Sequence, residues 1–319
     1  MHDNSKVLLI GSGGMAGEYL KVLTSLGKRV VIVGRGDKKL DNLKKSYPGH
    51  EYYYGGLESY LKTNPSIPNF VINAVNIEYL GDVSCKILEY GAKNLLIEKP
   101  GDINEEGLKN ICDLAEAKNA VVCVAYNRRF YTSVMDVIAE SEKDGGITSL
   151  HFEFTEWTHT FGTDTHSLLA LNNWILSNSS HVIDTAFYLI GEPKELFSNV
   201  LGSDKVEWHP SGSVFVGSGI SERNIPFSYH ANWNGPGRWA IEIISAKRRF
   251  YLKPMEKLFQ QELASITVVE VVINDELDNK FKPGLFLQTS EFLNSKFDNL
   301  QKIDDQLRAM NYYQKISGY

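Results

Sequence analysis

The chain has 319 residues, which is enough for two domains of ~150 residues each. Hydrophobic residues make up 43% and charged residues 23%, values that are typical of globular proteins and exclude a disordered or fibrous chain. The 33 basic and 39 acidic residues give a net charge of −6, so the chain lacks the basic field that binds a nucleic-acid backbone.

The first third of the chain alternates short apolar runs with amphipathic segments. Residues 6–10 form an apolar run that ends at glycines, and Met15, Tyr19, Val22 and Leu26 then recur at the spacing of one helix face. The strands expected from this pattern cover residues 6–10, 29–33, 51–54, 70–75, 94–97 and 120–125. Apolar strands without polar alternation, separated by helices, predict a parallel sheet covered on both faces.

The pattern changes to period-two alternation after Tyr126. The expected strands cover residues 150–157, 213–218, 227–233, 239–245, 248–252 and 265–273, with helices at 179–190 and 284–297. Residues 234–237 (NGPG) and 246–248 (AKR) are typical of hairpin connections. We therefore predict two domains, residues 1–126 with a parallel sheet and residues 127–319 with a mostly antiparallel sheet.

The first candidate site is the glycine-rich turn after the first strand. Gly11, Gly13, Gly14, Met15 and Ala16 follow the G-x-G-x-x-G/A pattern between a strand and a helix. Gly11 permits a tight turn, Gly13 lets a pyrophosphate approach the backbone, and the helix N-terminus faces the anion. The pattern predicts dinucleotide binding; the alternative is a tight turn in an α/β domain that binds no nucleotide.

The end of the second strand bears on the choice of cofactor. NAD-binding domains commonly carry an acid there for the ribose hydroxyls, but this chain has Gly34 and Arg35, followed by Lys38 and Lys39. A guanidinium can bind a 2′-phosphate through two hydrogen bonds, so NADP is slightly favoured over NAD. The alternative is that Arg35 is a solvated surface residue.

The third candidate site is Glu98-Lys99-Pro100, at the end of a buried strand. Ligands of such sheets bind outside the carboxyl ends of the strands, which places Lys99 on the cofactor side. Lys99 can be a structural ion-pair partner of Glu98, or it can hydrogen-bond a substrate hydroxyl that is losing its proton.

At this point the chain resembles the Gfo/Idh/MocA oxidoreductases. The resemblance rests on GSGGMA near the N-terminus and on EKP (98–100), YNRRF (126–130), SSHVIDTAFYLIG (179–191) and KPGLFLQTSEFL (282–293), in the expected order over nearly the whole chain. It implies an α/β protein with an N-terminal Rossmann dinucleotide-binding domain and a C-terminal α+β domain whose large, open, mostly antiparallel sheet forms an oligomer interface. It also implies oxidation or reduction of a carbinol carbon of a sugar, sugar derivative or cyclitol with NAD(P).

The resemblance also assigns residues. Lys99 and His181 match the catalytic lysine and histidine, and Pro100 matches a proline that is often cis. The implied cofactor-binding residues are Gly11, Gly13, Gly14, Met15, Ala16, Gly34, Arg35, Ala74, Val75, Asn76, Glu98, Lys99 and Asn127. The implied substrate-binding residues are Lys99, Asn127, Arg128, Asn178 and His181.

One position departs from the family pattern near His181. Many members have an aspartate four residues before the histidine, but this chain has Ser177 there, with Asn178 beside it. The hydrogen bonds of that aspartate must come from elsewhere. Asp184 lies three residues after His181 on the same helix face, so a neighbour could orient the imidazole for proton transfer. Without the resemblance, a histidine at a helix start is more often a cap or a core residue.

Histidines and aromatic residues of the second half allow further hypotheses. His159, Asp164 and His166 lie in a polar stretch without regular ligand spacing, so a loop over the substrate pocket is favoured over a metal site. Trp174, Trp233 and Trp239 are either core residues or sugar-stacking residues. Tyr229, Trp233, Trp239 and Ile241 are expected to form an apolar sheet face, which predicts a homodimer or homotetramer.

These observations predict an NAD(P)-dependent oxidoreductase that transfers a hydride to or from a sugar-like small molecule, including nucleotide sugars, without a metal. The alternatives are an NAD-dependent glycoside hydrolase with a transient hydride step and a non-catalytic sensor that binds the cofactor. No apolar run reaches the ~20 residues of a membrane helix, and the N-terminus has only four apolar residues before its glycines. The cysteines, Cys85, Cys112 and Cys123, show no disulfide or zinc spacing, so a cytoplasmic protein without a membrane partner is expected.

Overall fold

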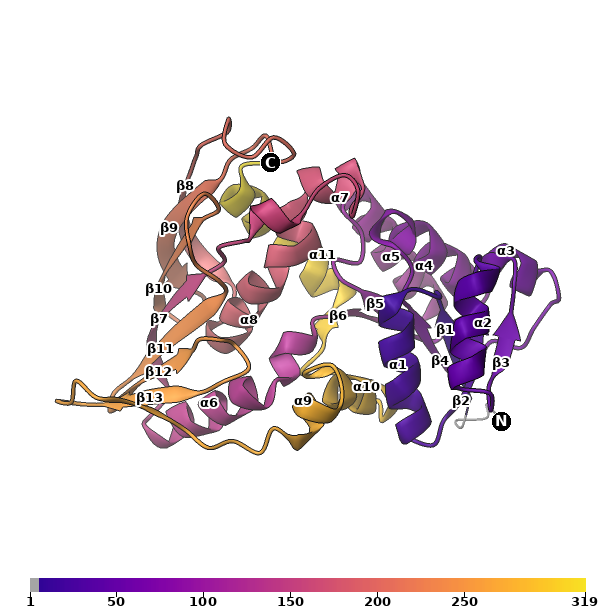
Figure 1. Cartoon of the computed structure of the whole chain (residues 1–319), viewed down its shortest axis with the longest axis horizontal. Helices are drawn as coiled ribbons and strands as arrows, with labels where there is room; N and C mark the ends of the chain where they lie inside the picture. The colour runs from indigo at the N-terminus through magenta and orange to yellow at the C-terminus, as the bar shows by residue number, and fades with distance from the viewer. Residues whose placement is uncertain (1–5) are drawn as a thin grey trace. The chain divides into compact units, whose positions relative to one another are not determined.

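The computed structural model describes residues 6–319, which form two compact units (Figure 1). Among these residues, the first unit contains 6–126 together with 280–308, and the second contains 127–279 and 309–319. The expected second domain was a continuous segment, residues 127–319. The structure differs in that residues 280–308 return to the first unit, where a helix and a short edge strand extend its layers.

The first unit is built on a seven-stranded sheet of order β15-β6-β5-β4-β1-β2-β3. Its strands are β1 (Lys6–Ile10), β2 (Arg29–Val33), β3 (Glu51–Tyr53), β4 (Phe70–Asn73), β5 (Asn94–Glu98), β6 (Val121–Ala125) and β15 (Gln301–Lys302). Strands β1 to β6 pair in parallel and only β15 is antiparallel. The central residues of β1, β4 and β5 are fully buried, as the apolar runs predict.

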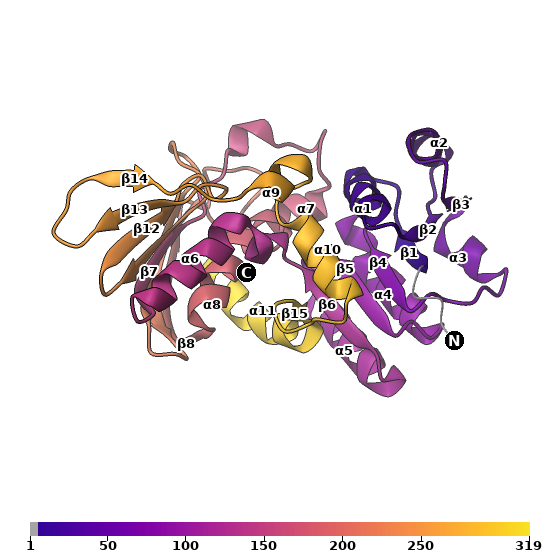
Figure 2. The ribbon, with the colours of Figure 1, turned by 90° about the horizontal axis from the view of Figure 1, so that it is seen from below.

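Helices cover this sheet on both sides, which explains why its central strands show no polar alternation. They are α1 (Gly14–Ser25), α2 (Asp37–Ser46), α3 (Gly56–Leu61), α4 (Leu80–Glu89), α5 (Glu105–Lys118) and α10 (Leu285–Leu293), with a 3-10 turn η1 (Ile77–Tyr79) before α4. Helix α10, from the returning segment, packs beside α1 (Figure 2). Helix α11 (Ile303–Ser317) begins in the first unit and ends in the second.

The second unit is built on an eight-stranded sheet of order β14-β13-β12-β11-β7-β10-β9-β8. Its strands are β7 (Ile147–Glu153), β8 (Pro193–Leu201), β9 (Val214–Ser221), β10 (Pro226–Asn232), β11 (Ala240–Ser245), β12 (Arg248–Leu252), β13 (Phe259–Glu262) and β14 (Val268–Glu270). All pairs are antiparallel except β7 with β10, which confirms the mostly antiparallel sheet. The chain therefore contains an α/β unit with a parallel sheet and a second unit with a mostly antiparallel, open sheet, and the predicted fold class is confirmed.

Two helices pack on one face of this second sheet. Helix α6 (Thr132–Lys143) contacts β12, and α8 (Ser180–Ile190) contacts β7 and β11 (Figure 2). The shorter helical segments of the unit are η2 (Asn127–Phe130), η3 (Thr158–Thr160), α7 (Leu168–Asn172), the π-helix η4 (Ile175–Ser179) and α9 (Glu276–Lys280), whose last residue belongs to the first unit.

One predicted hairpin is absent from the second sheet, and two of its strands, β8 and β13, were not predicted. AKR connects β11 and β12 as a hairpin, as predicted. NGPG does not connect paired strands, because β7 lies between β10 and β11 in the sheet. Strand β8 was not predicted, and the run at 265–273 contains only the short strand β14, while β13 precedes it.

The aromatic sheet face lies on the helix-covered side, contrary to expectation. Tyr229, Trp233, Trp239 and Ile241 are all at most 6% exposed and belong to the core of the second unit. Their alternation with polar residues was correct, but the face they form packs against α8 and its neighbours. The opposite face carries Ser228, His230 and the exposed Phe197. An oligomer interface therefore cannot use the residues that suggested it.

Candidate active site

The glycine-rich turn lies between β1 and α1 and brings two strands close to the helix N-terminus. Gly11 has a φ of 127°, and a Cβ there would overlap the carbonyl of Ala74, so only glycine allows this close approach. The Gly11 amide donates to the Val33 carbonyl over 2.8 Å, and the Ala74 amide donates to the Ile10 carbonyl over 2.8 Å. These bonds tie the turn to the ends of β2 and β4.

The first turn of α1 is open to an anion. Gly13 occupies the N-cap position without a side-chain cap, and no acidic residue lies in the first turn. A Cβ on Gly13 or Gly14 would meet no atom within 4 Å, so there is free space beside the backbone amides. Free amide donors and the positive end of a helix dipole form a site for a phosphate or pyrophosphate.

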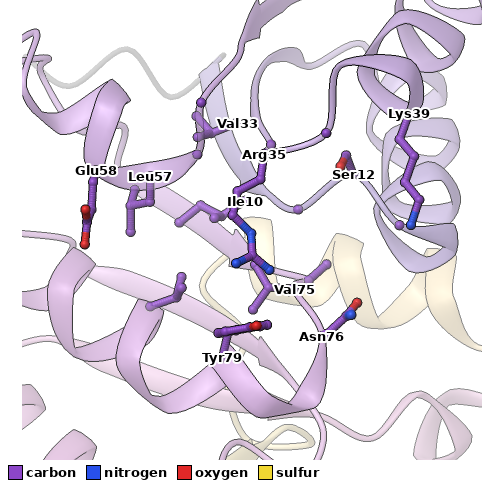
Figure 3. A pocket seen from close by; sticks show the side chains of 18 of the residues that line it. Ile10, Ser12, Val33, Arg35, Lys39, Leu57, Glu58, Val75, Asn76 and Tyr79 are labelled. Carbon is purple, nitrogen blue, oxygen red and sulfur yellow. The ribbon is translucent and has the colours of Figure 1, made fainter. Parts of the chain in front are cut away.

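A cavity of about 750 Å³ extends from this turn across the ends of β1, β2 and β4 (Figure 3). Arg35 enters it from the end of β2, and its guanidinium carbon lies 4.2 Å from the centroid of the Tyr79 ring. Gly56, with a φ of 81°, leaves room for Arg35, since a Cβ there would lie 2.8 Å from Arg35 Cγ. Lys38, Lys39 and Lys86 also line the cavity, together with the acidic residues Asp37, Glu58 and Asp82.

Most of the expected cofactor-binding residues meet in this cavity. The residues among its lining are Gly11, Gly13, Gly34, Arg35, Ala74, Val75 and Asn76. Gly14, Met15 and Ala16 are instead in the first turn of α1, Glu98 and Lys99 stand at the end of β5, and Asn127 begins η2 of the second unit. Further residues line the cavity that were not predicted from the sequence. Among them are Gly55 just before α3, Gly56 and Glu58 of α3, Tyr79 of η1 and Lys86 of α4.

Lys99 directly follows β5, which lies between β4 and β6 in the sheet. Its neighbour Glu98 accepts a hydrogen bond from the Tyr19 hydroxyl of α1 over 2.8 Å. Burial raises the pKa of Glu98, and the charge of Lys99, the Tyr19 bond and the charge of Lys282 oppose that rise. The Lys99–Pro100 peptide bond is cis, as the resemblance implied. Lys99 thus lies at the carboxyl end of a central strand, the side of a parallel sheet on which ligands bind.

His181 lies in the first turn of α8 and is 7% exposed. Its backbone carbonyl accepts a hydrogen bond from the Thr185 hydroxyl over 2.7 Å, and its ring centroid lies 6.2 Å from that of Trp239. The preceding residues form the π-helix η4, and π-turns inside helices are frequent at functional sites. The wider turn changes the directions of Ser177, Asn178 and Ser179 relative to a regular helix.

The side chain of Ser177 does not stand in for an acid. Its hydroxyl donates to the Ala170 carbonyl over 3.0 Å. A carboxylate reaches the same turn from another element: Glu156, three residues beyond β7, accepts from Asn178 Nδ2 over 3.0 Å and from Ser179 Oγ over 2.7 Å. Its second oxygen accepts from Arg238 over 3.0 Å.

Glu156 is 1% exposed, so its carboxylate can be charged only because these hydrogen bonds and the Arg238 guanidinium take the place of water. Burial raises the pKa of Glu156, and Ser179, Arg238 and Asn178 oppose the rise. Neither Glu156 nor Arg238 was predicted as a site residue. No spacing rule connects them to residues 178 and 179, because the contact depends on how β7 and η4 pack.

Asp184 does not orient His181, contrary to expectation. Both of its oxygens accept hydrogen bonds from Arg129, over 2.8 Å from Nε and 2.6 Å from Nη2. Asp184 is 1% exposed and Arg129 9%, so the two form a buried ion pair between α8 and η2. Arg129, next to the predicted Arg128 in the chain, was not expected to have this role.

The tryptophans fall into two groups. Trp174 and Trp233 pack in an aromatic cluster with Trp208, and His166 contacts Trp174, with ring centroids 4.9 Å apart. Trp239 contacts His181 and two arginines instead. Within residues 6–319, no group of three His, Cys, Asp or Glu side chains could hold a metal ion. No helix in the same range is long and apolar enough to cross a membrane.

Similar folds occur among solved structures. The sequence itself matches no protein-family model and no curated protein. Levoglucosan dehydrogenase in complex with NADH and L-sorbose is 17% identical with a TM-score of 0.76, covering 98% of this chain and 95% of its own. An oxidoreductase from Agrobacterium radiobacter in complex with NAD+, L-tartaric acid and magnesium is 15% identical with a TM-score of 0.78, covering 97% and 94%.

A third structure is that of a UDP-N-acetylglucosamine 3-dehydrogenase from Acidithiobacillus ferrooxidans. It is 12% identical with a TM-score of 0.73, covering 98% of this chain and 96% of its own. At such low identities the likeness concerns the fold and not the substrate. Over its full length, this chain has the fold of the Gfo/Idh/MocA-type NAD(P)-dependent oxidoreductases.

Proposed function

We propose that the chain is an NAD(P)-dependent oxidoreductase that transfers a hydride between the nicotinamide and a carbinol or keto carbon of a sugar, sugar derivative, nucleotide sugar or cyclitol. The observation that carries this proposal is the cavity at the glycine-rich turn, with its uncapped helix N-terminus and the Arg35–Tyr79 stack. The pyrophosphate would bind the amides of the α1 turn, and Arg35 and Tyr79 would hold the adenosine end. When bound, the dinucleotide supplies the hydride acceptor or donor.

Lys99 and His181 are the proposed catalytic residues. A lysine ammonium can hydrogen-bond the substrate oxygen and stabilise the negative charge that develops on it. An imidazole can take or return the proton of that oxygen near neutral pH. Asn127, Arg128 and Asn178 are the proposed substrate-binding residues. The side-chain amide nitrogen of Asn178 donates a hydrogen bond to Glu156. The side-chain oxygen of Asn178 would then accept a hydrogen bond from a substrate hydroxyl.

The NAD-dependent glycoside hydrolase and the cofactor-binding sensor remain the alternatives. A stoichiometric assay separates the three functions: the purified protein is incubated with NAD(P)+ or NAD(P)H and sugar panels, and net change in NAD(P)H is compared with product formed. An oxidoreductase changes one cofactor per product, a hydrolase forms product with no net change, and a sensor forms none. Because no disulfide joins Cys85, Cys112 and Cys123, we also propose a cytoplasmic location.

We expect the protein to bind NADPH more tightly than NADH. Arg35 can meet the 2′-phosphate with a charge-assisted contact worth about 1.5–3 kcal/mol, a ten- to hundred-fold gain in affinity. Arg35→Ala should remove this preference. Arg29→Ala is the matched control, because Arg29 begins the same strand and its side chain is 70% exposed. Fluorescence titration of both cofactors measures the effect, and equal or tighter NADH binding by the unchanged protein would contradict the assignment.

We expect a dimer or tetramer through the face of the second sheet that the helices do not cover. Phe197 and Leu201 lie on this face of β8 and are 68% and 61% exposed, and exposed apolar side chains gathered on an open sheet favour an interface. Light scattering at micromolar concentration should give the mass of an oligomer, and Phe197→Asp should shift it toward the monomer. A monomer for the unchanged protein would count against this surface.

A further inference from the structure

Trp239 in the second unit contacts two guanidinium groups. The Arg128 guanidinium carbon lies 4.4 Å from the Trp239 ring centroid, and that of Arg238 lies 4.6 Å from it. Arg238 also contacts the Trp157 ring at 4.8 Å. A guanidinium stacked on an indole keeps its N–H groups directed outward in its own plane, where they can bind a planar or tetrahedral anion.

The two arginines differ in how their charges are compensated. Arg238 donates to the buried carboxylate of Glu156 over 3.0 Å. Arg128 has no carboxylate within ion-pair distance among residues 6–319, and its Nη1 is buried without a hydrogen-bond acceptor. A guanidinium that lacks a counter-charge in a poorly solvated place is unfavourable. Because the Arg128 side chain is half-buried and not fully enclosed, a ligand can reach the guanidinium, and one that supplies the counter-charge gains affinity.

The groups around Arg128 do not remove this imbalance. The guanidinium carbon of Arg128 lies 5.7 Å from the centroid of the Tyr131 ring. The charges of Glu256 and Glu156 favour the charged form of Arg128, and the charge of Arg238 disfavours it. Burial has the largest effect and lowers the pKa of Arg128. Glu156 already pairs with Arg238, and Glu256 is exposed to solvent. Two arginines therefore lie against Trp239, and the buried carboxylate of Glu156 pairs with only one of them, Arg238.

We propose that the substrate carries an anionic group, a carboxylate or a phosphate, that Arg128 binds beside Trp239. This inference rests on the proposed function, because it assigns the substrate class of the same site. A neutral hydroxyl can accept only one bond from the guanidinium, whereas a carboxylate or phosphate accepts two and cancels the charge. The substrates in question are sugar acids or sugar phosphates, and neutral sugars lack the group that Arg128 would bind.

Matched sugars test the inference by binding rather than turnover. Isothermal titration calorimetry compares D-glucose, D-glucuronate and D-glucose 6-phosphate, then D-galactose, D-galacturonate and D-galactose 6-phosphate, with inorganic phosphate as the sugar-free anion. Binding of NADH and of NADPH is titrated first, and each sugar titration is then run without a cofactor and with each of the two. We expect at least one anionic member to bind about tenfold or more tightly than its neutral partner, the gain of one charge-assisted contact. The carboxylate and phosphate members distinguish the two sources of the anion.

Three variants assign the effect to Arg128. Arg128→Gln should reduce the preference to within about twofold, the level expected when no charge-assisted contact is left, and Arg128→Lys should keep part of it because a point charge remains. Arg249→Gln is the control with the same loss of charge, since Arg249 is exposed on β12 of the same unit. Circular dichroism is used to check that each variant is folded.

Several results would overturn the inference. They are equal binding of anionic and neutral partners, absence of binding by every anion at millimolar concentration, or a preference that survives in Arg128→Gln. If NADH and NADPH both fail to bind, the proposed function is wrong, whereas normal cofactor binding without an anion preference refutes the substrate class alone.

Discussion

We expect Lys99→Ala to lower kcat by on the order of 10²-fold or more, the usual effect of losing a charge-stabilising or proton-transferring group. Lys99 directly follows the central strand β5. The pairing of β5 with β4 and β6 fixes where this strand ends, and therefore where the backbone of Lys99 lies. Cofactor affinity should change much less, because Lys99 is not among the residues that line the cavity at the glycine-rich turn. Steady-state kinetics and cofactor titration measure the two effects separately.

The matched comparison is His181→Ala, which should also remove most turnover and leave cofactor binding intact. Its pH–rate profile should lose the limb near neutrality, since an imidazole titrates in that range. Lys99→Ala should retain this limb. Full activity of Lys99→Ala would exclude a role for the lysine, and a neutral limb that persists in His181→Ala would assign the proton to another group.

The sequence predicted the parallel sheet well because its signals are local. Each central strand is an apolar run, and Gly11 marks the close approach of the turn to Ala74. The returning segment could not be assigned, because a helix such as α10 does not show by its own pattern which sheet it will cover. Its place beside α1 depends on long-range packing.

The second sheet was harder to predict because its strand order is non-local. Sequence neighbours β10 and β11 are separated by β7, so a turn-like sequence between them does not form a hairpin. Alternation predicted which residues share a face, and Tyr229 and Ile241 do share one, but it does not tell which face is buried. The helices that cover the face come from elsewhere in the chain.

The residues of the candidate site also fall into those that a local sequence pattern predicts and those that depend on long-range packing. The glycine motif and Arg35 belong to recognisable local patterns, and the cavity brings them together. Tyr79, Glu156 and Arg238 belong to none, since their roles depend on contacts between elements far apart in sequence. Asp184 shows the opposite error: spacing correctly placed it near His181 on one helix, but its carboxylate binds a guanidinium of another element.

This buried pair between Asp184 and Arg129 leads to the largest expected effect on stability. Burial raises the pKa of Asp184, and the charge and hydrogen bonds of Arg129 oppose that rise. The replacement Asp184→Asn keeps the shape of the side chain but leaves the Arg129 charge buried without its counter-charge.

We expect Asp184→Asn to lower the free energy of unfolding by about 3–5 kcal/mol, as measured for buried pairs that lose one partner. The control is Asp204→Asn, whose ion pair with Lys205 is exposed and should contribute little. Urea denaturation followed by circular dichroism measures both variants. Because Asp184 holds η2 against α8 and does not orient the imidazole, the folded fraction of Asp184→Asn should keep the neutral limb of the pH–rate profile. Loss of that limb with unchanged stability would instead give Asp184 the orienting role, and the hydrogen bonds to Arg129 would then be secondary.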